Sequence, residues 1–349
     1  MEETSTDSRD EDDSTTKAAA TAGYNVLELS LANNTIASWA VIVLSSLLLL
    51  WHSVRRKASR SNSSHKYCPN PNCIRCRRYA EVNVNARRRL PWVLKAVNHK
   101  GNELERVSQA VRQGPLWSQN NDHDGISPVL GQYPTVLLVH GLIAQPLVTW
   151  LHPHVEAVFG HDKIMLRQRL FAEYIAAQTD QISWLQNDVQ EGEWKVLHLL
   201  NQGVWQKQHC QKCPTLASVI QQLQPHVMDK CLFGNVFVSV LQPGTLIEPH
   251  CGPTNVRHRL HYALQVPDDD YAAAKLTVMD KQQTWKEGHY FVFNDSFTHS
   301  VVYPATNQSS EKQRASRVVL IVDLWHPQLS QLERKVITEL YSAQKASTT

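Results

Sequence analysis

The protein has 349 residues, of which 42% are hydrophobic and ten are tryptophan, and its formal net charge is +3. A chain of this length and composition can bury the core of one large domain or of two smaller ones. The small net charge gives no general attraction for a polyanion, so the composition argues against a nucleic-acid partner.

Residues 1–34 are predicted to be a disordered acidic tail. Acidic residues, serine and threonine dominate its first part, where Arg9 and Lys17 are the basic residues. Such a segment lacks the apolar pattern needed to offset the conformational entropy lost on folding.

Residues 35–54 are predicted to be a single transmembrane helix. The uncharged run IASWAVIVLSSLLLLW extends from Ile36 to Trp51. At about 1.5 Å per residue, this segment can cross a hydrocarbon core about 30 Å thick. Trp39 and Trp51 suit the two membrane interfaces. A buried helix of a soluble domain is the alternative; a cleaved signal peptide fits less well, because a long polar stretch precedes the run.

The charges around this run indicate an orientation. Arg55, Arg56, Lys57 and Arg60 follow it, whereas Lys17 is the nearest comparable charge before it. The excess of basic residues on the cytoplasmic side of membrane proteins would therefore place the C-terminal domain in the cytosol.

Residues 55–132 are predicted to form a cysteine-containing juxtamembrane region and linker. The sequence YCPNPNCIRCRRY gives Cys68, Cys73 and Cys76 a spacing that plant-type iron–sulfur proteins also use, and HCQKC supplies Cys210 and Cys213. Disulfides, or thiols without a function, are the plainer interpretation. A metal bound by the first group, or a zinc ion joining both groups, remains open.

A helix is predicted from Leu90 to Val111, because apolar residues recur there at helical spacing. The basic run from Arg87 to Arg89 is expected on a solvated helix face, with lipid headgroups as the alternative partner. Residues 113–127 are rich in Gly, Asn, Asp and Ser, which is typical of a linker.

The main domain is expected to span residues 133–330. The segment PTVLLVHGL at 134–142 predicts a strand; its VHGL resembles part of an α/β-hydrolase, but the chain has no Gly-x-Ser-x-Gly sequence, so that class is rejected. A helix is predicted at 164–182, with a buried stripe formed by Leu166, Leu170, Tyr174 and Ile175. Residues 331–349 are expected to hold the C-terminal helix and tail, the helix itself being predicted at 328–344.

Short strands follow one another in the second half of the chain and predict a β-sandwich or jelly roll. They are expected at 236–241, 259–266, 275–279, 289–293, 300–303 and 317–323. Residues alternate between the two faces of a strand, so Arg259 and His261 share one face and an apolar set backs them. The same alternation groups Arg317 with Asp323.

Two histidines and two arginines occupy the ends of these runs. His250 and His299 lie at strand edges, whereas Arg259 and Arg317 begin strands. Neutral imidazoles bind redox metals, and a guanidinium binds a carboxylate through two parallel hydrogen bonds. The pattern therefore suits a site for iron and 2-oxoglutarate.

Three sequence boxes extend this interpretation: PHCGPTNVRHRLH, DSFTH and RVVLIVDLWHP. With these boxes in this order, the chain resembles the aspartyl/asparaginyl β-hydroxylases, and most closely their membrane-anchored branch. The resemblance covers Leu137 to Leu329 and is weaker before Trp194. It implies a double-stranded β-helix, the cupin-like jelly roll, with flanking helices and one preceding transmembrane helix.

The resemblance also implies a role for each matching residue. His250 and His299 would bind Fe(II). Ser239 and Arg317 would bind the distal carboxylate of 2-oxoglutarate, with His261 near its other end; the residues facing the substrate would be Trp194, Arg259 and Asp295. The carboxylate that usually completes such a metal site is replaced by Gly252, and water is expected to fill the gap.

The function implied is an Fe(II)- and 2-oxoglutarate-dependent dioxygenase that hydroxylates Asp, Asn or a related side chain of a protein substrate. Two alternatives remain: a catalytically lapsed, membrane-anchored binding or scaffold protein, and another metal-dependent cupin activity. The resemblance favours the lumen of the endoplasmic reticulum for the catalytic domain, against the orientation that the basic residues indicate.

Overall fold

The computed structural model describes residues 73, 77–98, 102–114, 132–149, 153–160, 163–179, 183–267, 273–305 and 315–343. The compact unit that contains them extends from Tyr67 to Thr349. The acidic tail expected at 1–34 and the transmembrane helix expected at 35–54 lie outside the described residues. Within those residues, no helix combines the length and the hydropathy that crossing a bilayer requires.

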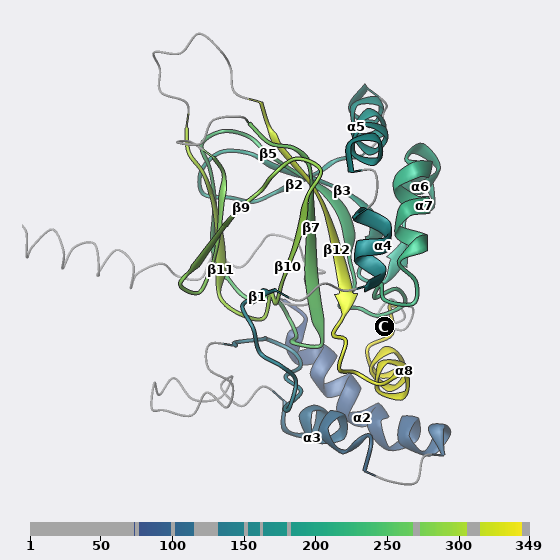
Figure 1. Ribbon diagram of the computed structural model, residues 1–349. Coiled ribbons are helices and arrows are strands. Elements are labelled where there is room, and N and C mark those ends of the chain that lie inside the picture. The colour runs from purple at the N-terminus through teal and green to yellow at the C-terminus, as the bar shows by residue number, and fades with distance from the viewer. Residues whose placement is uncertain are drawn as a thin grey trace, which may run out of the picture. The chain divides into compact units, whose positions relative to one another are not determined.

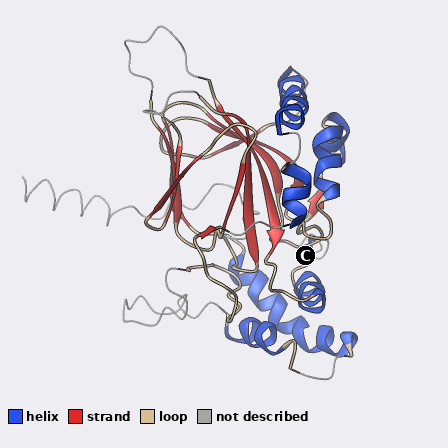
Figure 2. Ribbon diagram, in the orientation of Figure 1, coloured by secondary structure: helices blue, strands red, loops and turns tan. Residues whose placement is uncertain are grey.

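Two antiparallel sheets form the core (Figures 1 and 2). The larger sheet has the strand order β1-β10-β7-β12-β5-β3-β2, with β4 paired to β3; the smaller sheet has the order β6-β11-β8-β9. From β5 onward, successive strands pass from one sheet to the other, except between β8 and β9. This winding is that of a jelly roll. The expected mainly β jelly roll with helices is therefore confirmed.

The strands have the following bounds: β1 Leu147–Val148, β2 Leu185–Asn187, β3 Trp194–Asn201, β4 Val204–Trp205, β5 Val236–Leu241, β6 Thr245–His250, β7 Arg257–Gln265, β8 Lys275–Val278, β9 Lys281–Thr284, β10 Tyr290–Phe293, β11 His299–Tyr303 and β12 Arg317–Trp325. Strand β5 matches its predicted range. The other five predicted strands differ by one or two residues, at both ends for β7 and at one end for the rest. Strand β6 was not predicted, because its Pro249 and the neighbouring glycines indicate a turn.

The two faces of the large sheet bury different sets of side chains. Ala263, Val319 and Ile321 point toward the small sheet, where they pack against residues such as Leu276 of β8. Leu260, Tyr262, Leu264 and Leu320 lie on the opposite face, among apolar residues of the covering helices. The predicted alternation in β7 and β12 is confirmed. The interior between the sheets receives Arg259, His261 and Arg317.

Helices cover the outer face of the large sheet and one end of the domain (Figure 2). The covering helices are α4 Pro153–Phe159, α5 Lys163–Thr179, α6 Lys207–Lys212 and α7 Pro214–Gln222; the end of the domain carries α2 Tyr79–Val97, α3 Glu105–Gln113 and α8 Gln331–Leu340. Apolar residues of α2, α3 and α8 share one buried cluster with Trp325. The helices before residue 133 thus belong to the same compact unit as the jelly roll.

Several predicted elements differ from the structure. The helix predicted at 90–111 is two helices, because Asn98 takes a left-handed conformation with φ 46° and ends α2. The segment 134–142 forms no strand; it makes a single bridge from Leu137 to Thr254. Its buried backbone is satisfied instead by the Asn255 side chain, which bonds both the N–H and the carbonyl of Val139.

Two smaller predictions about helix surfaces also need correction. In α5 the buried stripe is Leu170, Tyr174 and Ala177, whereas Ile175 is 45% exposed. The basic run on α2 is not simply a solvated face. Arg87 donates to the carbonyl of Val111 in α3, and Arg89 donates to those of Glu339 and Leu340 in α8.

Candidate active site

The structure brings His250 and His299 together between the two sheets. His250 is the last residue of β6 and His299 the first of β11, and the two are register partners in the small sheet. Their ring centroids are 4.2 Å apart, with 54° between the planes. His299 is 4% exposed, and His250 is partly exposed.

Both rings are oriented by hydrogen bonds to backbone carbonyls. Nδ1 of His250 donates to the Glu248 carbonyl at 2.7 Å, and Nδ1 of His299 donates to the Phe297 carbonyl at 2.9 Å. Because a carbonyl can only accept, the proton of each neutral ring is on Nδ1 and its lone pair is on Nε2. Metal-binding histidines are commonly fixed in this way, so the pair is suited to hold one metal ion.

Four charged residues form a cluster near the histidines: Arg257, Asp295 and Asp323 are buried, and Arg259 is 15% exposed. Arg259 binds Asp323 with two hydrogen bonds of 2.8 and 3.1 Å. Arg257 bonds both carboxylates, at 3.1 Å to Oδ1 of Asp295 and 3.0 Å to Oδ2 of Asp323. Both aspartates are 0% exposed, so each buried charge is compensated within this cluster. Burial by itself would raise the pKa of Asp295, but Arg257 and Arg259 hold it well below the usual value.

Asp295 occupies the place next to Gly252 where an additional ligand side chain would begin. The backbone N–H of Gly252 donates to the Asp295 carbonyl at 2.6 Å. A Cβ built on Gly252 would lie 2.6 Å from the carboxylate carbon of Asp295. The space next to the glycine is thus taken by the aspartate side chain, and the expectation that water completes the metal site stays a prediction.

Arg317 lies deeper between the sheets, at the start of β12. Its side chain is 1% exposed, and it donates to Ser239 Oγ at 2.9 Å, as Trp194 Nε1 does at 3.1 Å. The guanidinium carbon is 4.8 Å from the centre of the Trp285 ring. Among the described residues no carboxylate pairs with Arg317, and its buried Nε has no hydrogen-bond partner. Burial lowers the pKa of Arg317 to about 9.

His261 links the Arg317 region to the paired histidines. Trp285 Nε1 donates to His261 Nδ1 at 3.3 Å, so the ring proton of neutral His261 is on Nε2, a buried atom with no partner among the described residues. The His261 ring is 5.1 Å from that of Phe293, which is 5.3 Å from that of His299. Burial first, then the charges of nearby cations, holds the pKa of His261 well below its usual value.

The expected substrate-facing residues occupy two different places. Arg259 and Asp295 lie in the buried charge cluster beside the histidines, whereas Trp194 bonds Ser239 at the Arg317 end. Trp285 and Arg257 were not identified from the sequence. Arg257 has the alternation of β7 as a signal, since it lies two residues before Arg259 and faces the same way; Trp285 follows β9 and has no comparable signal.

The second cysteine group shows no metal-binding geometry. His209 Nδ1 bonds the His198 carbonyl at 2.6 Å, Cys210 Sγ donates to the Leu199 carbonyl, and Cys213 is buried in the core. Across the described ranges, His, Cys, Asp and Glu form no cluster of three that could hold a metal. Cys68 and Cys76 lie outside those ranges, so the expectation for the first group stays a prediction.

The strand order of the two sheets defines a jelly-roll protein, and His250 and His299 meet between its sheets. Residues 166–327 match the sequence model of the aspartyl/asparaginyl beta-hydroxylase family. The match spans somewhat less than half of the chain, and it confirms the resemblance to this family that the three sequence boxes predicted.

Relatives of two kinds are similar to this chain. Human aspartate beta-hydroxylase domain-containing protein 2 is 29% identical over 289 residues, which cover 82% of this chain and 73% of that protein. Human aspartyl/asparaginyl beta-hydroxylase is 28% identical over 243 residues, 68% of this chain but only 30% of that protein.

One similar solved structure is HygX from Streptomyces hygroscopicus with nickel and 2-oxoglutarate bound, which is 7% identical to this chain. The alignment covers 46% of this chain and 79% of that chain, with a TM-score of 0.31. A Pseudomonas putida prolyl-4-hydroxylase is 14% identical, with 46% of this chain and 86% of that chain covered and a TM-score of 0.30. At these TM-scores, the similarity between the structures is partial.

Proposed function

We propose that the protein is an Fe(II)- and 2-oxoglutarate-dependent dioxygenase that hydroxylates an Asp, Asn or related side chain of a protein substrate. The observation that carries the proposal is the buried Arg317, which has no carboxylate partner among the described residues. An isolated buried cation is costly, so a protein that keeps one commonly supplies an anion from outside the chain.

A dicarboxylate fits the groups around Arg317. The guanidinium would bind the distal carboxylate with two hydrogen bonds, one of them from the Nε that has no protein partner. Ser239 accepts hydrogen bonds from Trp194 and Arg317, so its own hydroxyl proton can be donated to the same carboxylate. The unpartnered Nε2–H of His261 supplies a further donor toward the histidine pair.

The metal would be held by Nε2 of His250 and Nε2 of His299, both set by their Nδ1 bonds. Iron and 2-oxoglutarate together supply the chemistry: one atom of O₂ enters a C–H bond of the substrate and the other enters succinate, while CO₂ leaves. The protein orients both histidines through the carbonyls of Glu248 and Phe297, and Arg257 and Arg259 keep Asp295 ionised nearby.

Arg259 is the residue proposed to contact the substrate side chain. It is 15% exposed, whereas Arg257 is 4% exposed. Because Asp323 and Asp295 already balance its charge, Arg259 is fixed in orientation and can donate to a carboxylate or to an amide oxygen without a large change in its own position.

The test is turnover of 2-oxoglutarate by the purified chain with Fe(II) and ascorbate, measured as succinate. We expect His250→Ala and His299→Ala each to abolish turnover and to lower the iron content of the protein. His289→Ala, at an exposed histidine outside the site, should change neither. Succinate release that survives both replacements, or a wild-type protein that carries zinc and no iron, would overturn the proposal.

A scaffold without catalysis is the second candidate, because no third metal-binding side chain joins His250 and His299 among the described residues. It predicts that the chain binds a protein partner while 2-oxoglutarate is not consumed, with or without that partner. Partner-independent succinate release from the wild-type chain, lost in the His299→Ala variant, distinguishes the enzyme from the scaffold.

We further propose that residues 35–54 anchor the protein in the membrane, with the catalytic domain in the lumen of the endoplasmic reticulum. Asn33 lies before this segment, and Asn62 and Asn307 lie after it, each within an Asn-x-Ser/Thr glycosylation sequence. In cells, a glycan lost in the Asn62→Gln/Asn307→Gln variant supports a lumenal domain. A glycan lost only in Asn33→Gln places the domain in the cytosol.

A further inference from the structure

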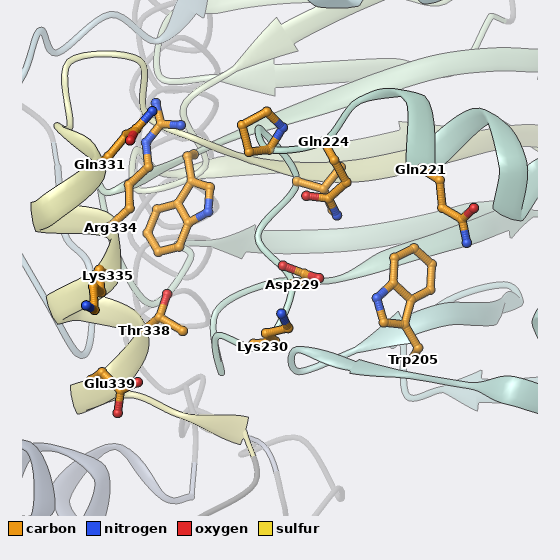
Figure 3. A pocket seen from close by; sticks show the side chains of 13 residues that line it. Trp205, Gln221, Gln224, Asp229, Lys230, Gln331, Arg334, Lys335, Thr338 and Glu339 are labelled. Carbon is orange, nitrogen blue, oxygen red and sulfur yellow. The ribbon is translucent and has the colours of Figure 1, made fainter.

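A cavity lies outside the jelly-roll interior, between α8 and the segment of residues 221–230 (Figure 3). Its volume is about 730 Å³, within the size range of small-molecule pockets. The floor and walls include two tryptophans, Trp205 from β4 and Trp325 from the end of β12. None of the eight residues predicted for the iron and 2-oxoglutarate site lines it.

Arg334 of α8 lines this cavity, and its side chain is half-buried (Figure 3). Its Nε is buried and has no hydrogen-bond partner, and no carboxylate among the described residues forms an ion pair with it. Other arginines at this end of the domain are satisfied: Arg106 binds Glu333, and Arg89 binds carbonyls of α8. Burial lowers the pKa of Arg334, as it does for Arg317.

The neighbouring charges define what Arg334 can bind. Asp229 and Glu339 also line the cavity, yet neither approaches Arg334 within ion-pair distance. Lys230 and Lys335 add positive charge to the lining. A carboxylate would form two hydrogen bonds with the guanidinium of Arg334, and a flat apolar group attached to it would pack against the indole of Trp325.

We propose that this pocket binds a carboxylate joined to an apolar or aromatic group, through Arg334 and the indole of Trp325. The carboxylate of a small organic acid and the carboxylate of a peptide share this chemistry. The site is independent of the iron and 2-oxoglutarate site, so its test does not depend on turnover.

The experiment is calorimetric titration of the full chain in detergent with N-acetyl-L-phenylalanine, its neutral amide, phenylacetate and inorganic phosphate. We expect N-acetyl-L-phenylalanine to bind with a Kd of the order of 1 mM or tighter. The amide should bind at least about tenfold more weakly, because it lacks the charge that Arg334 requires. Phenylacetate at equal affinity points to a small acid, and weaker phenylacetate binding points to a peptide group.

Three variants locate the ligand. Arg334→Gln should abolish binding, whereas Arg112→Gln, at an exposed arginine of α3, should preserve it. Arg317→Gln should also preserve it, which separates this pocket from the jelly-roll interior. The Arg334 side chain makes no hydrogen bond that folding requires, so the thermal midpoint of Arg334→Gln should stay close to that of the wild type.

Four results would overturn the proposal: absence of binding at about 10 mM N-acetyl-L-phenylalanine, equal affinity for the acid and its amide, binding that survives in Arg334→Gln, or binding of phosphate in preference to the carboxylates. The last result would show an anion site of different chemistry.

Discussion

Asp295 lies against Gly252, with its carboxylate carbon 2.6 Å from the place where a Cβ of residue 252 would be. The two-histidine, one-carboxylate metal site of non-haem iron oxygenases usually has its acid near such a position. Here the neighbouring carboxylate comes instead from the segment between β10 and β11, and Arg257 and Arg259 hold it. Because residue 252 has no side chain, the buried carboxylate of Asp295 can occupy the space beside it.

We expect Gly252→Ala to destabilise the fold by about 1–3 kcal/mol, because the added methyl group must displace Asp295 or the backbone. Urea unfolding of the two proteins at neutral pH measures the difference. In an Asp295→Ala background the same replacement should cost less, since the smaller side chain leaves room. Equal costs in the two backgrounds would show that the two positions are not coupled.

Arg317→Met is predicted to have opposite effects on stability and on ligand binding. The replacement removes a buried charge that has no protein counter-ion, so the free energy of unfolding should rise by about 1–2 kcal/mol. The affinity for 2-oxoglutarate should fall by at least about 100-fold, because the fork for its distal carboxylate is lost. Urea unfolding and calorimetric titration measure the two effects.

Arg317→Lys is the control for charge. It keeps the cation but cannot form two parallel hydrogen bonds, so binding should be intermediate and stability should not rise. If Arg317→Met lost stability and kept its affinity, the arginine would be a structural residue and not the anion site.

The sequence predicted the parts of the fold that obey a simple period. Strand β5 is apolar and β-branched throughout, and the alternation in β7 and β12 placed Arg259, His261 and Arg317 between the sheets. The period did not predict β6. Pro249 and the neighbouring glycines are typical of a turn, yet this segment forms the strand that ends at His250. The period also failed for the segment 134–142, which is apolar but forms no strand, because the Asn255 side chain satisfies the buried backbone of Val139.

The contacts between distant segments could not be read from the sequence. Nothing in the pattern around Trp285 shows that its ring lies beneath Arg317 and bonds His261. Asp295 in the DSFTH box was assigned to the substrate, yet its two arginine partners come from a different strand. Arg89 looked like part of a solvated basic face, because α8 is far away along the chain.

The stability of the domain should decrease between pH 7 and pH 5, partly because of His326. This ring is 1% exposed; its Nε2 donates to the Ile143 carbonyl and its Nδ1 accepts from the Gln328 N–H. Burial, with the charges of Arg106 and Arg334, lowers its pKa to about 4, whereas the unfolded chain titrates near 6.5. Between these values only the unfolded state takes up the proton, so stability is lost as the pH falls.

The contribution of His326 should be about 2 kcal/mol between pH 7 and pH 5. Urea unfolding at the two pH values should show a smaller loss for His326→Gln than for the wild type. His289→Gln, at an exposed position, should retain the wild-type loss. The same loss in all three proteins would mean that groups other than His326 cause the pH dependence.

Arg89 is predicted to stabilise the docking of α2 onto the end of α8. Its guanidinium donates to the carbonyls of Glu339 and Leu340, at the C-terminal end of that helix, where a positive charge is favourable. Arg89→Ala should therefore lower the free energy of unfolding by about 1–2 kcal/mol. The adjacent Arg88 bonds only the exposed side chain of Asn85 among the described residues, so Arg88→Ala should change it by less than about 0.5 kcal/mol. Thermal unfolding of the two variants side by side makes the comparison, and equal midpoints would contradict a specific role for Arg89 at the end of α8.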